Sequence, residues 1–265
     1  MKKILLVGNR SLNQEKFKVQ NELLFDAAKK YNCFLDIKTN CDVFAHLQEN
    51  NNLDYDAILF YDKDIYLAKH FENMGKKVYN SSSAILNCDN KALTCLCLEK
   101  DNLPMPKTSI IPLLFYYDIN YLNDYIDSLI EKLKLPLICK EWFGSWGEQV
   151  YLLKTREEIV EIIEKKKGKE LLFQEFIKES SGEDIRVNVV GDRVVASMKR
   201  RSINGDFRAN ISNGGIMGNY IPTKEEEALA LRCAKSVGCD FCGVDILQST
   251  RGPLVCEINS NAHLI

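Results

Sequence analysis

The chain has 265 residues, 46% of them hydrophobic and 27% charged, an ordinary globular mixture that is long enough for two or three packed subdomains. Its formal net charge of −2 argues against a protein that coats nucleic acid, because such proteins usually carry a basic face. The apolar run in the opening MKKILLVGNR is too short for a signal peptide and no run reaches transmembrane length, so we expect a cytoplasmic protein with no nucleic-acid or membrane partner.

Residues 1–88 alternate between apolar strands and amphipathic helices. A helix is predicted where Phe17, Leu24 and Tyr31 recur at helical spacing, a short one around residues 43–47, and a third over IYLAKHFENMG, which Gly75 closes. The predicted strands are the apolar runs KILLVG, FLDI, DAILF and KKVYN. This alternation indicates an N-terminal α/β domain with an open parallel sheet.

A helical stretch capped by NSSS and reaching LCLEK leads into residues 89–168, where a second alternation follows the proline-containing linker NLPMPKT. A helix is predicted over residues 120–134, and another over TREEIVEIIEKKKG, where Thr155 and Glu158 fit a capping box. The predicted strands are residues 109–111, LPLICK and VYLLK. We expect a small central α/β domain.

Residues 169–265 favour longer strands. LLFQEFI is one, DIRVNVVGDRVVASMKRRS reads as a hairpin that turns at Gly191 and Asp192, and GVDILQSTRGPLVCEIN reads as a last hairpin. The helix TKEEEALALRCAKSVG, ended by Gly238, lies between the hairpins. The two hairpins predict antiparallel strand pairs in this C-terminal part of the chain, and strands and helices together place the chain in the α/β (α+β) class. The sequence stops soon after the last strand, and we expect this domain to be truncated.

The last hairpin concentrates oxygen ligands. Asp245 and Glu257 lie on its two arms as approximate cross-strand neighbours, and Asn259 projects from the same face as Glu257 because side chains alternate along a strand. Two buried carboxylates repel each other unless a cation lies between them, and oxygen ligands without His or Cys suit Mg²⁺ or Mn²⁺. An ordinary solvated hairpin face is an equal alternative on this evidence alone.

Two further segments suit phosphate and a third suits a nucleotide base. KEWFGSWGEQV begins with Lys140 and contains Gly144 and Gly147, whose N–H groups can approach phosphate, but it lacks the ending of a Walker A loop. MKRRSINGDFRANISNGG carries cations and amides that suit anions. QEFIKESSGED is compatible with a hinge that reads adenine and ribose. Each segment alone is equally typical of an exposed loop or a solvated basic patch.

The ten cysteines lie mostly within apolar runs, and CDFC places Cys239 and Cys242 in a C-x-x-C pair. No second Cys or His pair stands at zinc-finger spacing. We therefore expect buried reduced thiols in preference to a zinc or redox site.

The chain resembles the ATP-grasp superfamily, most closely the RimK-type ligases that add glutamate to a carboxylate. Five segments in chain order carry this resemblance: NKALTCLCLEKDNLPMPKT, KEWFGSWG, QEFIKESSGEDIRV, RRSINGDFRANISNGG and GVDILQSTRGPLVCEINSN. It implies an ATP-grasp fold with domains at residues 1–88, 89–168 and 169–265 and with ATP between the last two. GSWG is more similar to the branch that glutamylates a small carrier protein in lysine or arginine biosynthesis.

The resemblance implies ATP and Mg²⁺ (or Mn²⁺) as cofactors and assigns roles to individual residues. The implied cofactor-binding residues are Lys91 and Lys140 at the phosphates, Gly144, Ser145 and Gly147 in the glycine loop, Glu175, Phe176 and Ile177 at the adenine hinge, and Asp184 at the ribose. The implied metal ligands are Asp245, Glu257 and Asn259. The implied catalytic residues are Arg208, which also contacts the phosphates, Arg201 and Asn210.

The sequence departs from the RimK pattern in three places. Gln149 replaces a glycine that is common in the RimK loop, so the resemblance does not determine how this loop moves or closes. NSNAH replaces the family's NASPG after the metal ligands, on the acceptor side. The family's terminal helix has no counterpart here, which bears on stability and activity.

The implied function is an ATP- and Mg-dependent carboxylate–amine ligase that forms an amide through an acylphosphate. Glutamate is the implied amine substrate, and the acceptor is a protein, peptide or small-molecule carboxylate. Related ligases are often dimers or tetramers, so a homo-oligomer is implied. A small-molecule kinase of the same fold and a non-catalytic ATP-binding module are the alternatives. A nicotinamide dehydrogenase, suggested by ILLVGNR, is disfavoured because G-x-G-x-x-G is absent.

Overall fold

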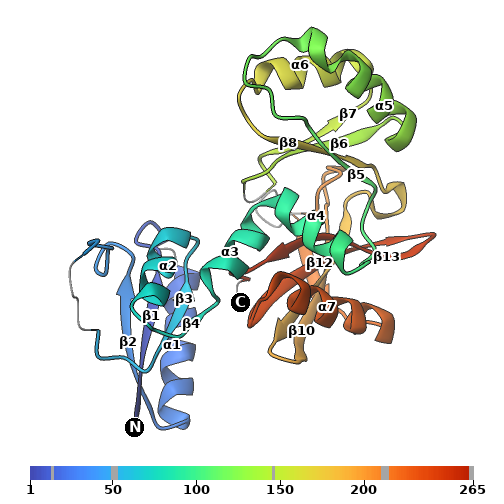
Figure 1. The fold of residues 1–265 in the computed structure, drawn as a ribbon. Coiled ribbons are helices and arrows are strands. Elements are labelled where there is room, and N and C mark those ends of the chain that lie inside the picture. Colours follow the sequence, from blue (N-terminus) through green and yellow to red (C-terminus); the bar gives the residue numbers. More distant parts are fainter. Residues whose placement is uncertain (13–14, 49–52, 145–146, 210–214, 263–265) are drawn as a thin grey trace.

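The computed structural model describes residues 1–12, 15–48, 53–144, 147–209 and 215–262, and it contains three sheets (Figure 1). The N-terminal sheet is parallel, with the strand order β2-β1-β3-β4. Its strands are β1 (Lys2–Gly8), β2 (Cys33–Thr39), β3 (Ala57–Tyr61) and β4 (Val78–Tyr79). The helices that follow are α1 (Glu15–Lys30), α2 (Ile65–Asn73) and α3 (Ser82–Asp89). The predicted open parallel sheet is confirmed.

One helix predicted in this region is wrong. Residues 43–47 form turns and irregular chain instead of a helix. Phe44 and Leu47 are exposed while Val43 packs against the core of the sheet, so the segment lacks the continuous apolar stripe that would anchor a helix.

The central sheet is antiparallel, with the order β5-β8-β6-β7, and two helices cover one of its faces (Figure 1). Its strands are β5 (Thr108–Ile110), β6 (Leu137–Glu141), β7 (Val150–Leu153) and β8 (Leu171–Glu175). The helices α5 (Asn123–Leu133) and α6 (Arg156–Lys165) bury their apolar stripes against Leu137, Cys139 and Phe173 in one core. The opposite face of the sheet, which carries Lys140, is left for the site.

The C-terminal sheet is antiparallel, with the order β11-β10-β9-β12-β13. Its strands are β9 (Glu183–Val190), β10 (Arg193–Arg201), β11 (Ile216–Asn219), β12 (Phe241–Ser249) and β13 (Gly252–Asn259). Helix α7 (Lys224–Val237) covers its apolar face, starting at a Thr223–Glu226 capping box and ending at Gly238 with φ 79°. Figure 1 shows α5 and α6 above the central sheet and α7 below the C-terminal sheet, so the two uncovered faces point toward each other.

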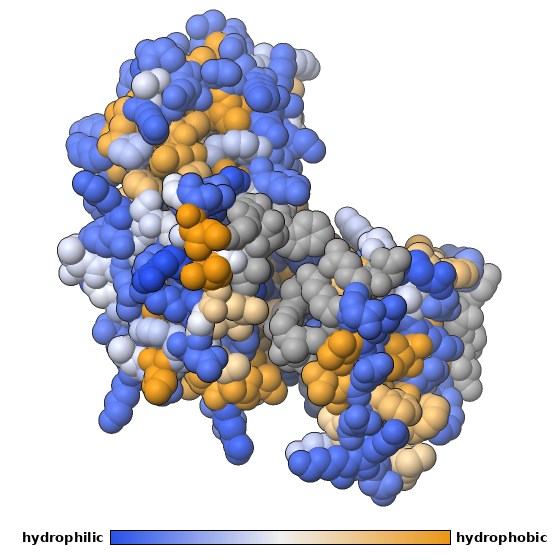
Figure 2. Space-filling model, turned by 180° about the vertical axis from the view of Figure 1, so that it is seen from behind, coloured by the Kyte–Doolittle hydropathy of each residue, from blue (hydrophilic) through white to orange (hydrophobic). Residues whose placement is uncertain are grey.

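The N-terminal unit projects away from the rest of the molecule, at the lower right of Figure 2. Its junction with the C-terminal sheet is formed around Asn80, whose amide nitrogen donates to the carbonyls of Phe241 and Ser260 at 2.8 and 3.0 Å. The Asn80 oxygen accepts from the amides of Asp240 and Phe241 at 2.6 and 3.2 Å. Tyr61 stacks on Phe241 with ring centroids 4.9 Å apart.

All ten cysteines are free, as predicted for reduced thiols, and five of them are buried. Cys239 of the C-x-x-C pair lies with its sulfur 3.4 Å from that of Cys88. None of the helices in the described part of the chain is long and apolar enough to cross a membrane.

Candidate active site

Lys91 occupies the first position of helix α4 (Lys91–Lys100) because Asn90 breaks the helical stretch that was predicted as continuous. Asn90 has extended backbone angles, and its side chain accepts hydrogen bonds from two amides of the first turn. Lys91 is 8% exposed, donates from Nζ to the Gly144 carbonyl at 3.0 Å and lies 3.6 Å from the Glu257 carboxylate. The start of α4 therefore connects the glycine loop to the last strand.

Lys140 is a second buried ammonium group, 7% exposed, near the end of β6. Its Nζ lies 3.4 Å from the carbonyl of Cys256, and no carboxylate of the described residues lies within 4.0 Å of it. Burial disfavours the charge, but Cys256 and Glu257 outweigh burial and raise the pKa of Lys140, so the group is a cation at neutral pH. A buried cation that has no direct carboxylate partner among the described residues suits an anionic ligand.

The hairpin of β12 and β13 places the predicted metal ligands on one face. The ladder shifts by one residue next to Asp245, so that Cys256 is an extra residue and Glu257 lies opposite Asp245. Asn259 lies opposite Gly243, one step further along the same face. The predicted cross-strand neighbours are confirmed, and a β-bulge sets their alignment.

Asp245 is 4% exposed and belongs to a buried ion network that the sequence did not reveal. Arg186 binds it through both carboxylate oxygens at 2.7 and 2.8 Å, and Arg200 approaches it at 2.9 Å. Arg200 also forms two hydrogen bonds of 2.6 Å with Asp184. Burial alone would raise the pKa of Asp245, but the two arginines hold it at about 2. Burial and the charge of Asp245 raise the pKa of Asp184.

The hairpin fits a hard cation through groups that the ion network leaves available. Asn259 donates from its amide nitrogen to Asp245 at 3.3 Å, which directs the amide oxygen away from that carboxylate. Within the described ranges Glu257 pairs with Lys91 alone, and its side chain is 32% exposed. Among the described residues no group of three or more His, Cys, Asp or Glu side chains forms a metal cage. A cation held here would therefore complete its shell with ligand oxygens, as Mg²⁺ commonly does with phosphates.

Arg208 reaches the far end of the glycine loop. Its Nη1 donates to the carbonyl of Gly147 at 2.7 Å, and Asp206 accepts from its Nε and Nη2 at 3.0 and 2.7 Å. The charge of Asp206 outweighs partial burial and raises the pKa of Arg208. Lys91 and Arg208 therefore bind the carbonyls of Gly144 and Gly147, and the two cations and the loop form one site with Glu257.

The other predicted residues lie apart from this cluster or outside the described residues. Glu175 accepts from the Lys107 amide at 2.7 Å and pairs with Arg251. Phe176 and Ile177 follow Glu175 at the end of β8, where Ile177 is buried. Asp184 is bound to Arg200, as described above, and Arg201 pairs with Glu183 on the other face of β10 from Arg200. Ser145 and Asn210 lie outside the described residues.

Arg186, Arg200 and Asn188 were not predicted. Asp184, Arg186 and Asn188 alternate along β9, so they share a face, and this period of two was readable in DIRVN. The sequence KRR does not show which arginine faces the site. Neighbouring residues of a strand point to opposite faces, so only one of Arg200 and Arg201 can reach Asp245, and it is Arg200.

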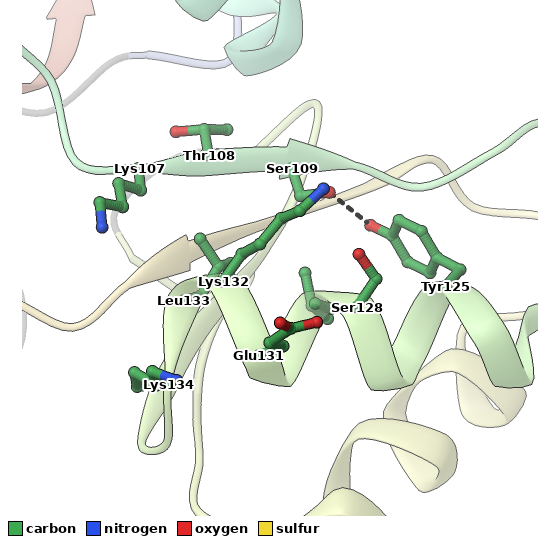
Figure 3. Close-up of a pocket in the computed structure, with 10 residues that line it drawn as sticks. Lys107, Thr108, Ser109, Tyr125, Ser128, Glu131, Lys132, Leu133 and Lys134 are labelled. Carbon is green, nitrogen blue, oxygen red and sulfur yellow. Dashed lines mark hydrogen bonds between the residues drawn. The ribbon is translucent and has the colours of Figure 1, made fainter.

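A cavity of about 620 Å³ lies outside this cluster, between edge strand β5 and helix α5 (Figure 3). Figure 3 shows Lys132 extending from α5 toward β5, beside the 3.3 Å hydrogen bond between Ser109 and Tyr125. None of the predicted site residues lines this cavity. The two buried lysines, Lys91 and Lys140, therefore mark the candidate active site in preference to this cavity.

Two solved structures share this architecture. A RimK domain protein ATP-grasp from Sphaerobacter thermophilus matches with a TM-score of 0.72 at 18% identity, over 99% of this chain and 92% of its own. D-alanine–D-alanine ligase from Bacillus anthracis, complexed with ATP, matches with a TM-score of 0.70 at 16% identity, over 100% and 87%. The fold is therefore that of the ATP-grasp proteins, as the sequence predicted.

The RimK-like ATP-grasp domain model matches residues 88–265, and the chain belongs to this family. A relative in Maridesulfovibrio salexigens is named "Probable alpha-L-glutamate ligase". It is 40% identical over 210 residues, which are 78% of this chain and 66% of the relative. The relatives of the chain thus include proteins named as probable glutamate ligases.

Proposed function

We propose that the chain is an ATP- and Mg-dependent carboxylate–amine ligase that adds glutamate to a protein, peptide or small-molecule carboxylate. The observation that carries the proposal is the pair of buried lysines, Lys91 and Lys140, that converges on the Glu257 hairpin. Two cations beside a hard-oxygen ligand set suit a polyphosphate and a divalent ion. The similarity to a relative named as a glutamate ligase supports glutamate as the amine substrate.

In this proposal the protein acts by positioning and charge neutralisation. Lys91 and Lys140 bind phosphate oxygens of ATP, and the glycine loop, tied to Lys91 and Arg208, covers them. Glu257 and Asn259 would hold Mg²⁺ beside Asp245, whose carboxylate oxygens are bound by arginines, and the ion would supply further neutralisation of the phosphate oxygens when bound. The hinge role of residues 175–177, the ribose role of Asp184 and the catalytic roles of Arg201 and Asn210 stay predictions.

The reaction has two balanced steps. The γ-phosphoryl group moves from ATP to an oxygen of the substrate carboxylate, which breaks one P–O bond, forms another and releases ADP. The neutral amine nitrogen then attacks the acyl carbon, the C–O bond to phosphate breaks with its electron pair, and the nitrogen releases one of its two protons while the amide keeps the other. Arg208 stands beside the loop, where its guanidinium would stabilise the negative charge that develops on the transferring groups.

ADP release by the chain with ATP, Mg²⁺, L-glutamate and a pool of carboxylate acceptors tests this function, with products identified by mass spectrometry. We expect ADP together with an acceptor that is heavier by one glutamyl residue. A phosphorylated acceptor without amide would identify a kinase. ATP binding without ADP from any pool would identify a non-catalytic module, and either result refutes the ligase.

Hydroxylamine provides a control for the first step, because it converts an acylphosphate to a hydroxamate without needing a site for the amine. Hydroxamate formation on a carboxylate of the acceptor pool that depends on ATP would support the acylphosphate even before the natural amine is known.

A further inference from the structure

The connection between β5 and α5 exposes a group of large apolar side chains to solvent. This group, which we call the apolar patch, consists of Leu113, Phe115, Tyr116 and Tyr121. Their exposed fractions are 78%, 91%, 87% and 68%. Single exposed apolar side chains are ordinary on a soluble protein, but several of them on one short segment indicate a surface that binds another molecule.

The segment that carries the apolar patch is fixed to the central domain. Apolar side chains interspersed with the patch pack against the core between the central sheet and its two helices, and they are Ile111, Leu114, Tyr117 and Ile119. Asp118 caps the short helix η1 (Ile119–Leu122) by accepting from the Asn120 amide at 2.9 Å. The outward side chains are therefore held in place before binding, which lowers the entropy that an interface must overcome.

The apolar patch does not face the candidate active site. Its segment packs into the core on the helix side of the central sheet, and Figure 1 shows this connection, in green, beside α5 and α6. Lys140 lies on the opposite face of that sheet, because its neighbour Cys139 points into the core and adjacent residues of a strand alternate. Contact with the substrates at Lys140 therefore does not account for the patch.

The area of the apolar patch is sufficient for an interface between two copies of the chain. An aromatic side chain covers about 150–250 Å², so the three aromatic members together expose roughly 500 Å². Two patches placed against each other would bury about 1,000 Å², before Leu113 and the neighbouring backbone are counted. A total of about 1,000 Å² is the lower end of the range for a specific protein interface.

The composition of the patch fits a second copy better than a charged partner. Asp118 is the one charged residue in the segment 111–122, and it is used as a helix cap. In a symmetric dimer the same surface occurs on both sides, so an uncharged patch meets its copy without repulsion, whereas an acidic or basic partner would find no opposite charge in this segment. Aromatic rings also pair favourably with one another in offset-stacked or edge-to-face arrangements.

We infer that the apolar patch is the surface through which two copies of this chain form a symmetric dimer. The inference does not depend on the proposed ligase function. The contact joins the two central domains on their helix sides, and it leaves the sheet face that carries Lys140 open in each copy.

Sedimentation velocity of the full chain over a range of concentrations tests the dimer. We expect a monomer–dimer equilibrium with a Kd on the order of 10 μM, in keeping with an interface of small area. Phe115→Ser should raise this Kd at least about tenfold, because buried aromatic side chains dominate the energetics of interfaces. Tyr116→Ser is the second variant. Both side chains are exposed in the single chain, so neither substitution removes a core contact, and circular dichroism spectra should match the wild type.

Tyr66→Ser is the matched control. Tyr66 is 81% exposed on α2 in the N-terminal unit, so this variant loses an equally exposed tyrosine without changing the patch, and its Kd should stay within about twofold of the wild type. A photoreactive p-benzoylphenylalanine in place of Phe115 should cross-link to residues 113–121 of a second copy. A chain that remains monomeric at about 100 μM, tenfold above the expected Kd, overturns the inference. So does a dimer that both patch variants leave unchanged, or one in which position 115 cross-links only to a different surface.

Discussion

Asn80→Ala is expected to destabilise the protein more than any other single amide deletion at the junction between the N-terminal unit and the C-terminal sheet. Asn80 is fully buried and makes four hydrogen bonds, two donated to carbonyls and two accepted from amides. Each buried group left without a partner costs about 1–3 kcal/mol. Water entering the space left by the amide would satisfy part of this set, so we expect a loss of about 3–5 kcal/mol.

Urea unfolding followed by circular dichroism measures this loss through the shift of the midpoint. Asn87→Ala is the matched control, because it removes an amide from the same region but breaks a single 3.2 Å hydrogen bond to Val237, for an expected cost of about 1 kcal/mol. Hydrogen exchange adds a local readout, since the amides of Asp240 and Phe241 should lose protection in Asn80→Ala. Equal midpoint shifts for the two variants, with unchanged exchange at Asp240 and Phe241, would refute the reasoning.

Three further changes have distinct expected outcomes. Asp245→Ala should cost about 3 kcal/mol, because it removes the carboxylate that binds the half-buried Arg186 and one of the two carboxylates that bind the buried Arg200. Glu257→Ala should cost less than about 1 kcal/mol and act mainly on the Mg²⁺ dependence of turnover. Thermal unfolding and Mg²⁺ titration separate the two variants, and similar stability losses would contradict the network. Burial alone would raise the pKa of Glu72, but hydrogen bonds from Ser82 lower this pKa overall. The ionised Glu72 carboxylate therefore contributes its full stabilisation above its unfolded pKa of about 4.3, and this stabilisation is lost as the pH falls through the folded pKa. Glu72→Gln should flatten the loss of stability between about pH 5 and pH 3, and an unchanged acid profile would count against this. Gly243→Ala should destabilise the protein by about 1–3 kcal/mol, because the added Cβ would lie 2.7 Å from the Cβ of Ala262 and one of the two must move. An unchanged midpoint of thermal unfolding would contradict this close approach.

The sequence predicts the elements well where the apolar period is long and bounded by caps. Thr223, for example, starts α7 and Gly238 ends it, as TKEEEALALRCAKSVG indicates. The alternation of strands and helices predicted the parallel sheet, and the turn near Thr250 predicted that Asp245 and Glu257 are cross-strand neighbours; the structure has both features. These features depend on neighbouring residues, which a sequence displays directly.

The parts of the site that could not be predicted depend on contacts between distant segments. The partners of Asp245 come from two other strands, 59 residues away in the case of Arg186, and no local pattern specifies them. The break at Asn90 is also a tertiary effect, because LNCDNKALTCL reads as one helix until the side chain of Asn90 is seen capping the next turn. Val255 and Ile258 both face the core although they are three residues apart, and this departure from a period of two was the one signal of the bulge.

The bulge at Cys256 separates two tasks within one strand. The extra residue presents its carbonyl and sulfur to Lys140, while Glu257 faces Lys91. Deleting Cys256 would leave an unbroken ladder in which Glu257 still lies opposite Asp245, so the metal ligands would keep their face while Lys140 lost its contact. Anchoring of the lysine and alignment of the ligands therefore depend on different residues of this arm, and removal of the bulged residue would not turn Glu257 and Asn259 into the core.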